Sequence, residues 1–285
     1  MLSKEKYKEL NKKIIIDEDL IPSYEEIIQC YNDMNDISKN TVKIQENDEN
    51  LLNIAELYCM YFGIMSLSIT SNKEDSNFKE KLLYSSIFST IANSTISVIY
   101  LAQKGLDYQA NVISRQLFEM CMLLLNISID EEKQDILMKT EMIEENMKIW
   151  RKYFSPKELN NTIEKYEGKG LTGWRKRQYS SYSNYSHNEF LSFFCFSFAC
   201  PKNDEDNLTS NLWGGYVSRV NTILENMINF LWYTSKAFMK IIVDKNTHIS
   251  KEILGTDQKL WNFSGYIFLL LDKYYSEYLE KNLSY

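Results

Sequence analysis

An arginine and a glutamate four residues apart, Arg115 and Glu119, are the first pair of side chains in this sequence that could do chemistry. Residues at this spacing are neighbours on one face of a helix. Apolar residues such as Phe118 and Met122 surround them, so both charges would enter a largely apolar setting. Because burying an ion pair is costly and is seldom adopted for stability alone, the pair is a candidate polar site. The alternative is an ordinary intrahelical salt bridge at a partly solvated edge, although arginine before glutamate is the less favourable order.

A second group of polar side chains lies further along the chain. Tyr179, Ser183 and His187 follow one another at four-residue steps and would share one helical stripe. His187 is one of two histidines in the chain, and imidazole is the usual general acid or base near neutral pH. Alternatively, His187 is an ordinary hydrogen-bonded residue, and the neighbouring hydroxyl groups only cap the local backbone.

A short basic run, Arg-Lys-Arg at 175–177, precedes this group and is interleaved with aromatic residues. Such a pattern suits a single-stranded nucleic acid, because phosphates pair with the cations and bases stack on the rings. Arg175, Arg177, Tyr179 and Tyr182 are therefore candidate substrate-binding residues. The alternative is a solvated helix start that binds nothing.

Composition limits the classes of function. The chain has 32 Lys and Arg against 39 Asp and Glu, a formal charge of −7, which argues against a broad grip on nucleic acid but leaves room for a local basic patch. No phosphate-loop, dinucleotide-binding, nucleophile-elbow or zinc-protease motif is present. With two histidines and no clustered carboxylate–histidine spacing, we expect neither a metal centre nor a cofactor.

The sequence also bears on location. The N-terminus lacks the apolar segment of a signal peptide, and the most apolar run, 190–200, is too short to span a bilayer as a helix. Five cysteines match no zinc signature and are typical of reduced thiols. We expect a cytoplasmic protein with no membrane association.

The elements that must position the candidate residues are helices. With 9 Gly and 3 Pro in 285 residues, the chain has few residues for the turns of an all-β fold or the loops of a nucleotide-binding α/β fold. Apolar periodicity predicts two long helices over 78–103 and 107–127, with Gly105 as a left-handed cap and Asp107 as the N-cap of the second. The second is apolar nearly all round, so we expect it to be central.

Other predicted helices cover 3–13, 23–34, 51–69, 130–153, a segment opening at Ser155–Pro156, 212–243 and 258–278, whereas 36–50 and 168–173 are predicted loops. Glu158 is placed for a capping box at the start of the Pro156 helix. The prediction is an all-α fold with an N-terminal helical extension over 1–50 and a single helical-bundle domain over 51–285.

Two of these segments together resemble a known family. Gly105 at a helix–helix turn, an aromatic residue and Arg115-x-x-x-Glu119, followed by Tyr/Ser-rich residues ending in Ser183-x-x-x-His187, are similar to the motifs of an uncharacterised family of bacterial all-helical proteins. That family is in turn similar to the HEPN superfamily (higher eukaryote and prokaryote nucleotide-binding). The likeness covers roughly residues 78–245. It implies an HEPN-like helical bundle that often dimerises, with the polar residues of the two segments facing each other.

Many HEPN proteins are metal-independent ribonucleases of toxin–antitoxin and phage-defence systems, with an Arg-x(4–6)-His site usually completed across a dimer. This chain departs from that pattern, since the nearest arginine before His187 is Arg177, ten residues upstream. The resemblance implies that His187 would act on the ribose 2′-hydroxyl or the leaving oxygen. Arg115 or Arg177 would stabilise charge on the phosphate, and Glu119 would orient Arg115.

Two hypotheses follow. The first is an HEPN-like protein of a bacterial stress or phage-defence system, a metal-independent endoribonuclease whose catalytic residues are Arg115, Glu119, Ser183 and His187. The second is a non-catalytic helical module that binds a nucleotide, RNA or a partner protein, in which the same residues form a structural hydrogen-bond network. In either case we expect a homodimer.

Overall fold

The computed structural model describes residues 3–12, 23–42, 49–70, 73–139, 143–167, 169–186, 198–199, 209–210, 220–244, 247–250 and 252–283. Over these residues the fold is all-α, as the sequence predicts, apart from one pair of two-residue strands. The helices are α1 (Lys4–Asn11), α2 (Tyr24–Val42), α3 (Glu49–Leu67), α4 (Phe78–Gln103), α5 (Asp107–Ile129), α6 (Glu131–Lys139), α7 (Ile143–Tyr153), α8 (Pro156–Glu167), α9 (Lys169–Ser186), α11 (Val220–Val243) and α12 (Gln258–Leu283). The strands β1 (Phe198–Ala199) and β2 (Thr209–Ser210) pair antiparallel, with Phe198 opposite Ser210.

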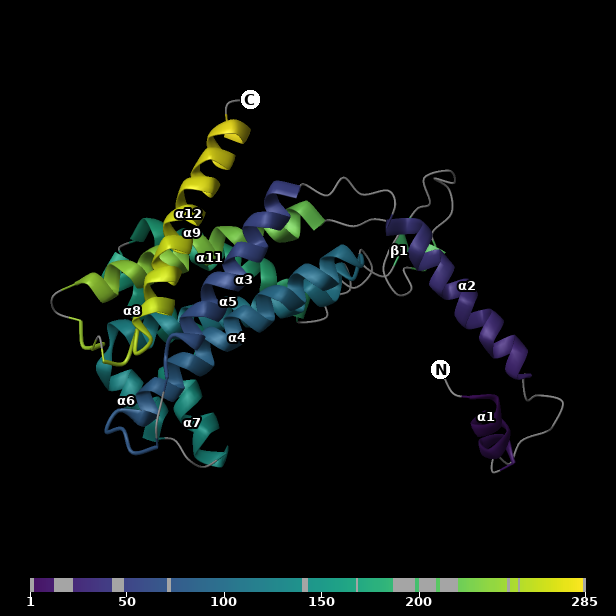
Figure 1. Cartoon of the computed structure of the whole chain (residues 1–285), viewed down its shortest axis with the longest axis horizontal. Helices are drawn as coiled ribbons and strands as arrows, with labels where there is room; N and C mark the ends of the chain where they lie inside the picture. Colours follow the sequence, from purple (N-terminus) through teal and green to yellow (C-terminus); the bar gives the residue numbers. More distant parts are fainter. Residues whose placement is uncertain are drawn as a thin grey trace.

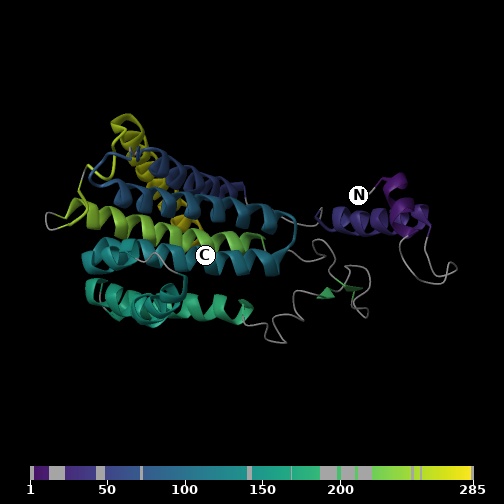
Figure 2. The same cartoon turned by 90° about the horizontal axis from the view of Figure 1, so that it is seen from below.

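Helix α5 lies at the centre of the bundle, which confirms the prediction from its apolar circumference. It packs against α4, α6, α8, α9 and α11, and every residue from Cys121 to Ser128 is buried. A helix that is apolar on all sides must be covered on all sides. Figure 2 shows α3 and α4 on one side of the bundle and α8 and α9 on the opposite side, while α12 packs on α3.

The turn between α4 and α5 is formed by a left-handed glycine. Gly105 has φ 68°, its N–H donates to the carbonyl of Ala102 at 2.9 Å, and the N–H of Leu106 donates to the carbonyl of Leu101 at 2.9 Å. This pair of bonds is the Schellman arrangement that glycine favours, so the predicted cap is confirmed. The predicted N-cap is wrong by one residue, because this tight turn lets α5 begin at Asp107 with Leu106 in the capping position.

Several predicted boundaries differ from the structure. Helix α2 continues to Val42, into the predicted loop over 36–50, and α9 begins at Lys169, so most of the predicted loop over 168–173 is helical. The loop prediction depended on Gly170 and Gly173, but buried side chains in the same turns, Thr172 and Arg175, hold this segment in a helix. The helix predicted over 130–153 is described as two helices, α6 and α7.

The predicted start of α8 agrees with the structure. Pro156 is its first residue, and the N–H of Glu158 points to the hydroxyl of Ser155 at 3.5 Å. Proline at the first helical position loses no intrahelical bond, because that N–H has no partner in any helix. This start fixes the position of α8, which contributes Asn160 to the contacts of Arg175 and five residues to a pocket, both described below.

The N-terminal helices lie apart from the bundle in both views (Figures 1 and 2). Helices α1 and α2 contact each other, with the rings of Tyr7 and Tyr24 centred 5.7 Å apart. Helix α3 begins at Glu49 and packs into the bundle against α4, α11 and α12. The extension predicted over 1–50 thus contains α1 and α2.

Two helices, α4 and α5, are long and apolar enough to cross a membrane by length and composition alone. In this fold 44% and 61% of their most apolar windows are buried. The core helices of a helical bundle have the same composition, so the observation is weak evidence for a membrane. The apolar run over 190–200 that the sequence singles out lies almost entirely outside the described residues.

Candidate functional site

Arg115 and Glu119 form an ion pair on one face of α5, as their spacing predicts. The Nε of Arg115 donates to Oε1 of Glu119 at 3.0 Å, and a terminal guanidinium nitrogen donates to the hydroxyl of Tyr179 on α9 at 3.0 Å. The Tyr179 hydroxyl donates in turn to Oε1 of Glu119 at 3.4 Å. These three side chains, the Arg115 cluster, form a closed set of hydrogen bonds across the contact between α5 and α9.

The Arg115 cluster is partly exposed. The side chains of Arg115 and Glu119 are 19% and 33% exposed, and the Arg115 guanidinium lies 5.4 Å from the centre of the Tyr179 ring. Burial opposes the charge on Arg115, but its bonds to Glu119 and Tyr179 outweigh burial and raise its pKa. Burial, with the charge of Glu119, also raises the pKa of Tyr179. The cluster therefore presents a permanent cation, paired with Glu119, beside a neutral phenol. Because Arg115 is partly exposed, unlike a buried ion pair, its guanidinium can also hold a phosphate oxygen.

The other two predicted catalytic residues are not placed beside this cluster. Ser183 belongs to α9, one turn beyond Tyr179, but its side chain lies outside the described part of the structure. His187 follows the end of α9 at Ser186 and also lies outside the described residues. Their meeting with Arg115 stays a prediction. The structure brings together Arg115, Glu119 and Tyr179, the last of which the sequence marks only as a substrate-binding candidate.

Arg175, predicted to bind substrate, is a buried structural residue instead. Its side chain is 0% exposed, and its guanidinium donates to the Glu167 carboxylate, to the side-chain amide oxygen of Asn160 and, at 3.3 Å, to the Thr172 hydroxyl. Successive residues of a helix point about 100° apart, so only one residue of the basic run faces inward. Arg177, at the other end of the run, is exposed, as its predicted role requires.

The contacts of Arg175 join three helices. Glu167, at the end of α8, is 6% exposed and also accepts a hydrogen bond from the Tyr233 hydroxyl on α11. Burial and the bond to Glu167 raise the pKa of Tyr233. With its charge matched by Glu167, Arg175 is not available to a ligand; it holds α9 in a fixed rotation against α8 and α11.

Tyr182 is likewise part of the core, so the prediction that it binds substrate is wrong. It is 3% exposed, and its ring packs against the rings of Phe118 and Phe230, with centroids 6.2 Å and 5.9 Å apart. The sequence contains a signal for this outcome. Arg175, Tyr179 and Tyr182 are spaced by four and three residues, the step of one helical face, and that face is turned toward the bundle.

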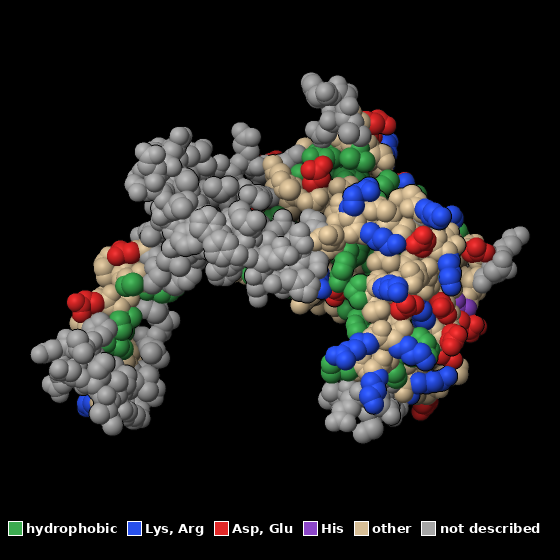
Figure 3. Space-filling model, turned by 180° about the vertical axis from the view of Figure 1, so that it is seen from behind, with side chains coloured by type: hydrophobic (Ala, Val, Ile, Leu, Met, Phe, Trp, Pro, Cys, Tyr) green, Lys and Arg blue, Asp and Glu red, His purple; other side chains and the backbone are tan. Residues whose placement is uncertain are grey.

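The outward side of the same helices is basic. Helices α7, α8 and α9 carry nine Lys or Arg against five Glu, the reverse of the balance of the whole chain. Eight of the nine are exposed and form what we call the basic surface: Lys148, Arg151, Lys152, Lys157, Lys165, Lys169, Lys176 and Arg177. Figure 3 shows Lys and Arg side chains gathered over this side of the bundle, with acidic side chains among them. Of the eight, Lys176 makes an ion pair, with Glu164 at 3.5 Å.

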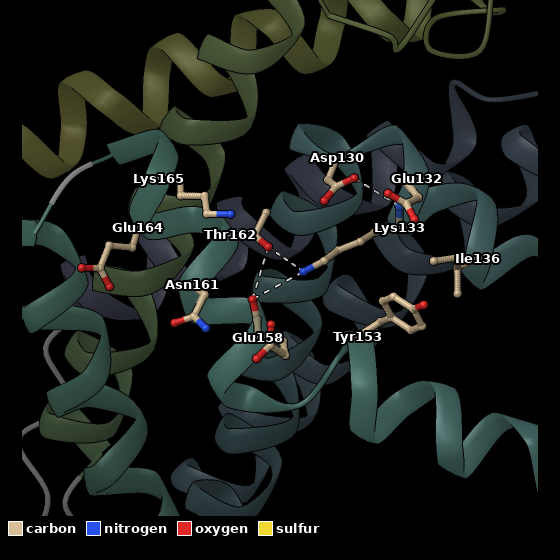
Figure 4. Close-up of a pocket in the computed structure, with 10 residues that line it drawn as sticks. All are labelled: Asp130, Glu132, Lys133, Ile136, Tyr153, Glu158, Asn161, Thr162, Glu164 and Lys165. Atoms are coloured by element: carbon tan, nitrogen blue, oxygen red, sulfur yellow. Dashed lines mark hydrogen bonds between the residues drawn. The ribbon is translucent and has the colours of Figure 1, made fainter.

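A pocket of about 600 Å³ opens beside the basic surface, between α6, α8 and the end of α7. It is lined by Asp130, Glu132, Lys133, Ile136, Tyr153, Glu158, Asn161, Thr162, Glu164 and Lys165 (Figure 4). No sequence motif marks it, because its residues come from three helices and from Asp130, between α5 and α6.

Lys133 forms the floor of this pocket, which we call the Lys133 pocket. Its ammonium donates to the Thr162 hydroxyl at 2.5 Å, to the Asn126 side-chain oxygen at 3.1 Å and to the Glu158 carbonyl at 3.4 Å. Burial lowers the pKa of Lys133, and the nearby charge of Lys165 adds to this effect, while Asp130 and Glu158 oppose it. Since an ammonium has three donors, Lys133 is fully engaged by the protein.

No family model matches this sequence, and no curated protein or solved structure matches it either. Among the described residues, no group of three or more His, Cys, Asp or Glu side chains is arranged to hold a metal ion. The features of the structure that bear on function are therefore the Arg115 cluster, the basic surface and the Lys133 pocket.

Proposed function

We propose that this protein is an all-α RNA-binding module that holds single-stranded RNA on the basic surface. The observation that supports this most directly is the concentration of eight exposed cations on three consecutive helices of a chain whose formal charge is −7. In a chain with an acidic excess, a local basic excess is a footprint for a polyanion. Phosphate contacts release the counterions condensed on the nucleic acid, which supplies most of the affinity.

Aromatic residues among these cations favour a single strand over a duplex. Trp150 is 42% exposed on α7, directly before Arg151 and Lys152 in the sequence. Bases of a single strand are free to stack on such rings, whereas those of a duplex are not. The Arg115 cluster, whose Tyr179 lies on the same helix α9 as Arg177, adds a further cation, Arg115 on α5, to which a phosphate could bind.

A charge-neutralised variant tests the proposal. We expect Arg151→Gln, Lys157→Gln and Lys169→Gln together to weaken binding of a 20-nucleotide single-stranded RNA at least tenfold. Because each cation lost removes a phosphate contact, the slope of log Kd against log salt should also fall by about 2. None of the three lines the Lys133 pocket.

The matched control for that variant removes three exposed lysines outside α7–α9, Lys73, Lys104 and Lys259. This control has the same net charge as the first variant but keeps the basic surface intact, so it should bind the RNA nearly as tightly as wild type. Equal weakening by both variants would mean that only overall charge matters, and absence of RNA binding by wild type would refute the proposal.

A second candidate is the HEPN-like, metal-independent ribonuclease of a bacterial stress or phage-defence system that the resemblance implies. What favours it is the Arg115 cluster, in which a partly exposed cation is oriented by Glu119, as the sequence-based mechanism requires. In this proposal Arg115 stabilises charge on the phosphate, and His187 moves the proton of the 2′-hydroxyl or of the leaving oxygen.

Cleavage separates the two candidates. Total RNA incubated with wild type in EDTA should give fragments ending in a 2′,3′-cyclic phosphate if the protein is a ribonuclease, and neither His187→Ala nor Arg115→Ala should produce them. RNA that is bound but left intact supports the binding module alone. Both candidates include a cytoplasmic location and a homodimer. Sedimentation of the purified protein would test the homodimer.

A further inference from the structure

We propose that the Lys133 pocket is a nucleobase subsite, which takes one base turned out of an RNA strand lying on the basic surface. The inference rests on the proposed RNA binding and adds to it a specific place and a base preference. Four features of the pocket support it: its volume, the aromatic ring of Tyr153 in its wall, its connection to the basic surface through Lys165, and the hydrogen-bond and ion-pair partners of its charged side chains.

The size and the wall suit a planar ring. Small-molecule sites generally measure about 300–1,000 Å³, and the volume of about 600 Å³ lies within this range. Tyr153 and Ile136 lie together at one end of the pocket (Figure 4). The Lys152 ammonium is 4.6 Å from the centre of the Tyr153 ring, but Lys152 does not line the pocket. A base stacked on Tyr153 from within the pocket would gain the usual base–aromatic energy.

The polar groups suit the edge of a base. Asn161 contributes an amide with both donors and an acceptor. The Thr162 hydroxyl beside it on α8 is already engaged, since it accepts from Lys133 and donates to the Glu158 carbonyl at 3.2 Å. Lys165 belongs to both the pocket and the basic surface, and its side chain points toward Thr162 (Figure 4). A phosphate held by Lys165 would place the adjoining base at the pocket.

The charged groups select a base over a free anion. Four carboxylates line the pocket, but Asp130 accepts the N–H of Lys133 at the start of α6, at 3.3 Å, and Glu164 pairs with Lys176. Glu132 and Glu158 are left to face a ligand, and they would repel a phosphate inside the pocket.

The same two carboxylates give the pocket a preference among bases. A carboxylate accepts a hydrogen bond from the exocyclic amine of cytosine, as in DNA recognition, and adenine and guanine carry such amines too. Uracil has none, so we expect the pocket to prefer an amine-bearing base over uracil.

The test compares RNA with and without bases. Fluorescence anisotropy would measure binding of a labelled 12-nucleotide oligo(C), of oligo(U) and of a fully abasic ribose-phosphate strand of the same length. We expect wild type to bind oligo(C) about tenfold more tightly than the abasic strand, with oligo(U) in between. Tyr153→Ala should remove most of this ratio while leaving the affinity for the abasic strand unchanged.

Two further variants keep the test decisive. The double variant Glu132→Ala/Glu158→Ala removes the two carboxylates and should lower the preference for oligo(C) over oligo(U), even if Tyr153→Ala does not fold. Tyr100→Ala, which removes an exposed tyrosine on α4, should leave all three affinities as in wild type.

The other outcomes separate this inference from the proposed function. Equal affinities for all three strands, unchanged in Tyr153→Ala but weakened in the Arg151/Lys157/Lys169 variant, would overturn the subsite and leave RNA binding in place. Absence of binding to every strand would overturn both. Binding of spermidine that depends on Tyr153, with no dependence on bases, would show that the pocket takes an organic cation and would also overturn the inference.

Discussion

The hydroxyl of Tyr179 accepts a hydrogen bond from the guanidinium of Arg115 at 3.0 Å and so joins α9 to the central helix α5. The same hydroxyl donates to Glu119, which Arg115 also contacts. Each member of the Arg115 cluster thus holds the other two in place, and loss of the phenol hydroxyl would leave the Arg115–Glu119 pair free to move.

Tyr179→Phe tests this linkage. We expect it to lower the free energy of unfolding by about 0.5–1.5 kcal/mol, near the lower end because the cluster is partly exposed, as measured by urea denaturation. Tyr100→Phe, at an exposed tyrosine on α4, serves as the control and should have no effect. Equal stability of the two variants would show that the Tyr179 hydroxyl contributes nothing to the fold.

Arg175→Met should lower the free energy of unfolding far more than Tyr179→Phe does. Glu167 would be left buried with its charge unmatched, and breaking a buried ion pair in this way costs about 3–5 kcal/mol. Arg177→Met, two residues along the same helix and exposed, should change stability little. Adding Glu167→Gln to Arg175→Met should restore part of the loss. A small effect of Arg175→Met on the thermal midpoint would mean that water replaces its guanidinium.

Two glycines should respond to alanine in opposite directions. Gly105→Ala should destabilise the protein by about 1–2 kcal/mol, since a Cβ is strained in the left-handed conformation that φ 68° requires. Gly63→Ala should stabilise it by about 0.5–1 kcal/mol, because Gly63 lies within α3 and a Cβ there meets no atom within 4 Å. Chemical denaturation of both variants checks the signs, and a loss of stability in Gly63→Ala would contradict the packing of α3.

Glu80 should make stability depend on pH. Burial raises the pKa of Glu80, the charges of Asp135 and Glu131 add to this effect, and His248 opposes it. A folded-state pKa above the unfolded value means that the folded protein binds the proton more tightly. Stability should therefore fall as pH rises from the unfolded pKa through the folded one.

Glu80→Gln removes the titrating group but keeps an acceptor for the Gln134 amide, which donates to Glu80 at 2.7 Å. We expect this variant to be more stable than wild type at pH 7, with the difference shrinking toward pH 4. A difference that is independent of pH, in thermal melts across this range, would exclude the titration of Glu80 as its cause.

Local features of the fold could be predicted from the sequence. The apolar periodicity gives α4 and α5 within a few residues, and the left-handed turn at Gly105 follows from the residue type alone. The contact between Arg115 and Glu119 follows from four-residue spacing. All three are set within one or two turns of chain, where helix geometry leaves few alternatives.

Features that depend on packing between helices could not be predicted. Helical spacing groups Arg175 with Tyr179 and Tyr182 on one face of α9, but only the contacts of α9 with α8 and α11 decide that this face is turned inward. The helical state of Gly170 and Gly173 depends on the same contacts. The Lys133 pocket requires Lys133 and Thr162 to meet, and no pattern in a single sequence links residues that far apart.

The position of α5 at the centre of the bundle has a consequence for the motions of the protein. Its amide groups are covered by five other helices, so local fraying of any one neighbour leaves most of them protected. We therefore expect the amides of α5 to exchange their hydrogens with solvent most slowly, at rates set by global unfolding. Arg115 extends from this helix, and its bonds to Glu119 and Tyr179 hold its guanidinium in place before a ligand arrives, so binding there requires little loss of conformational entropy.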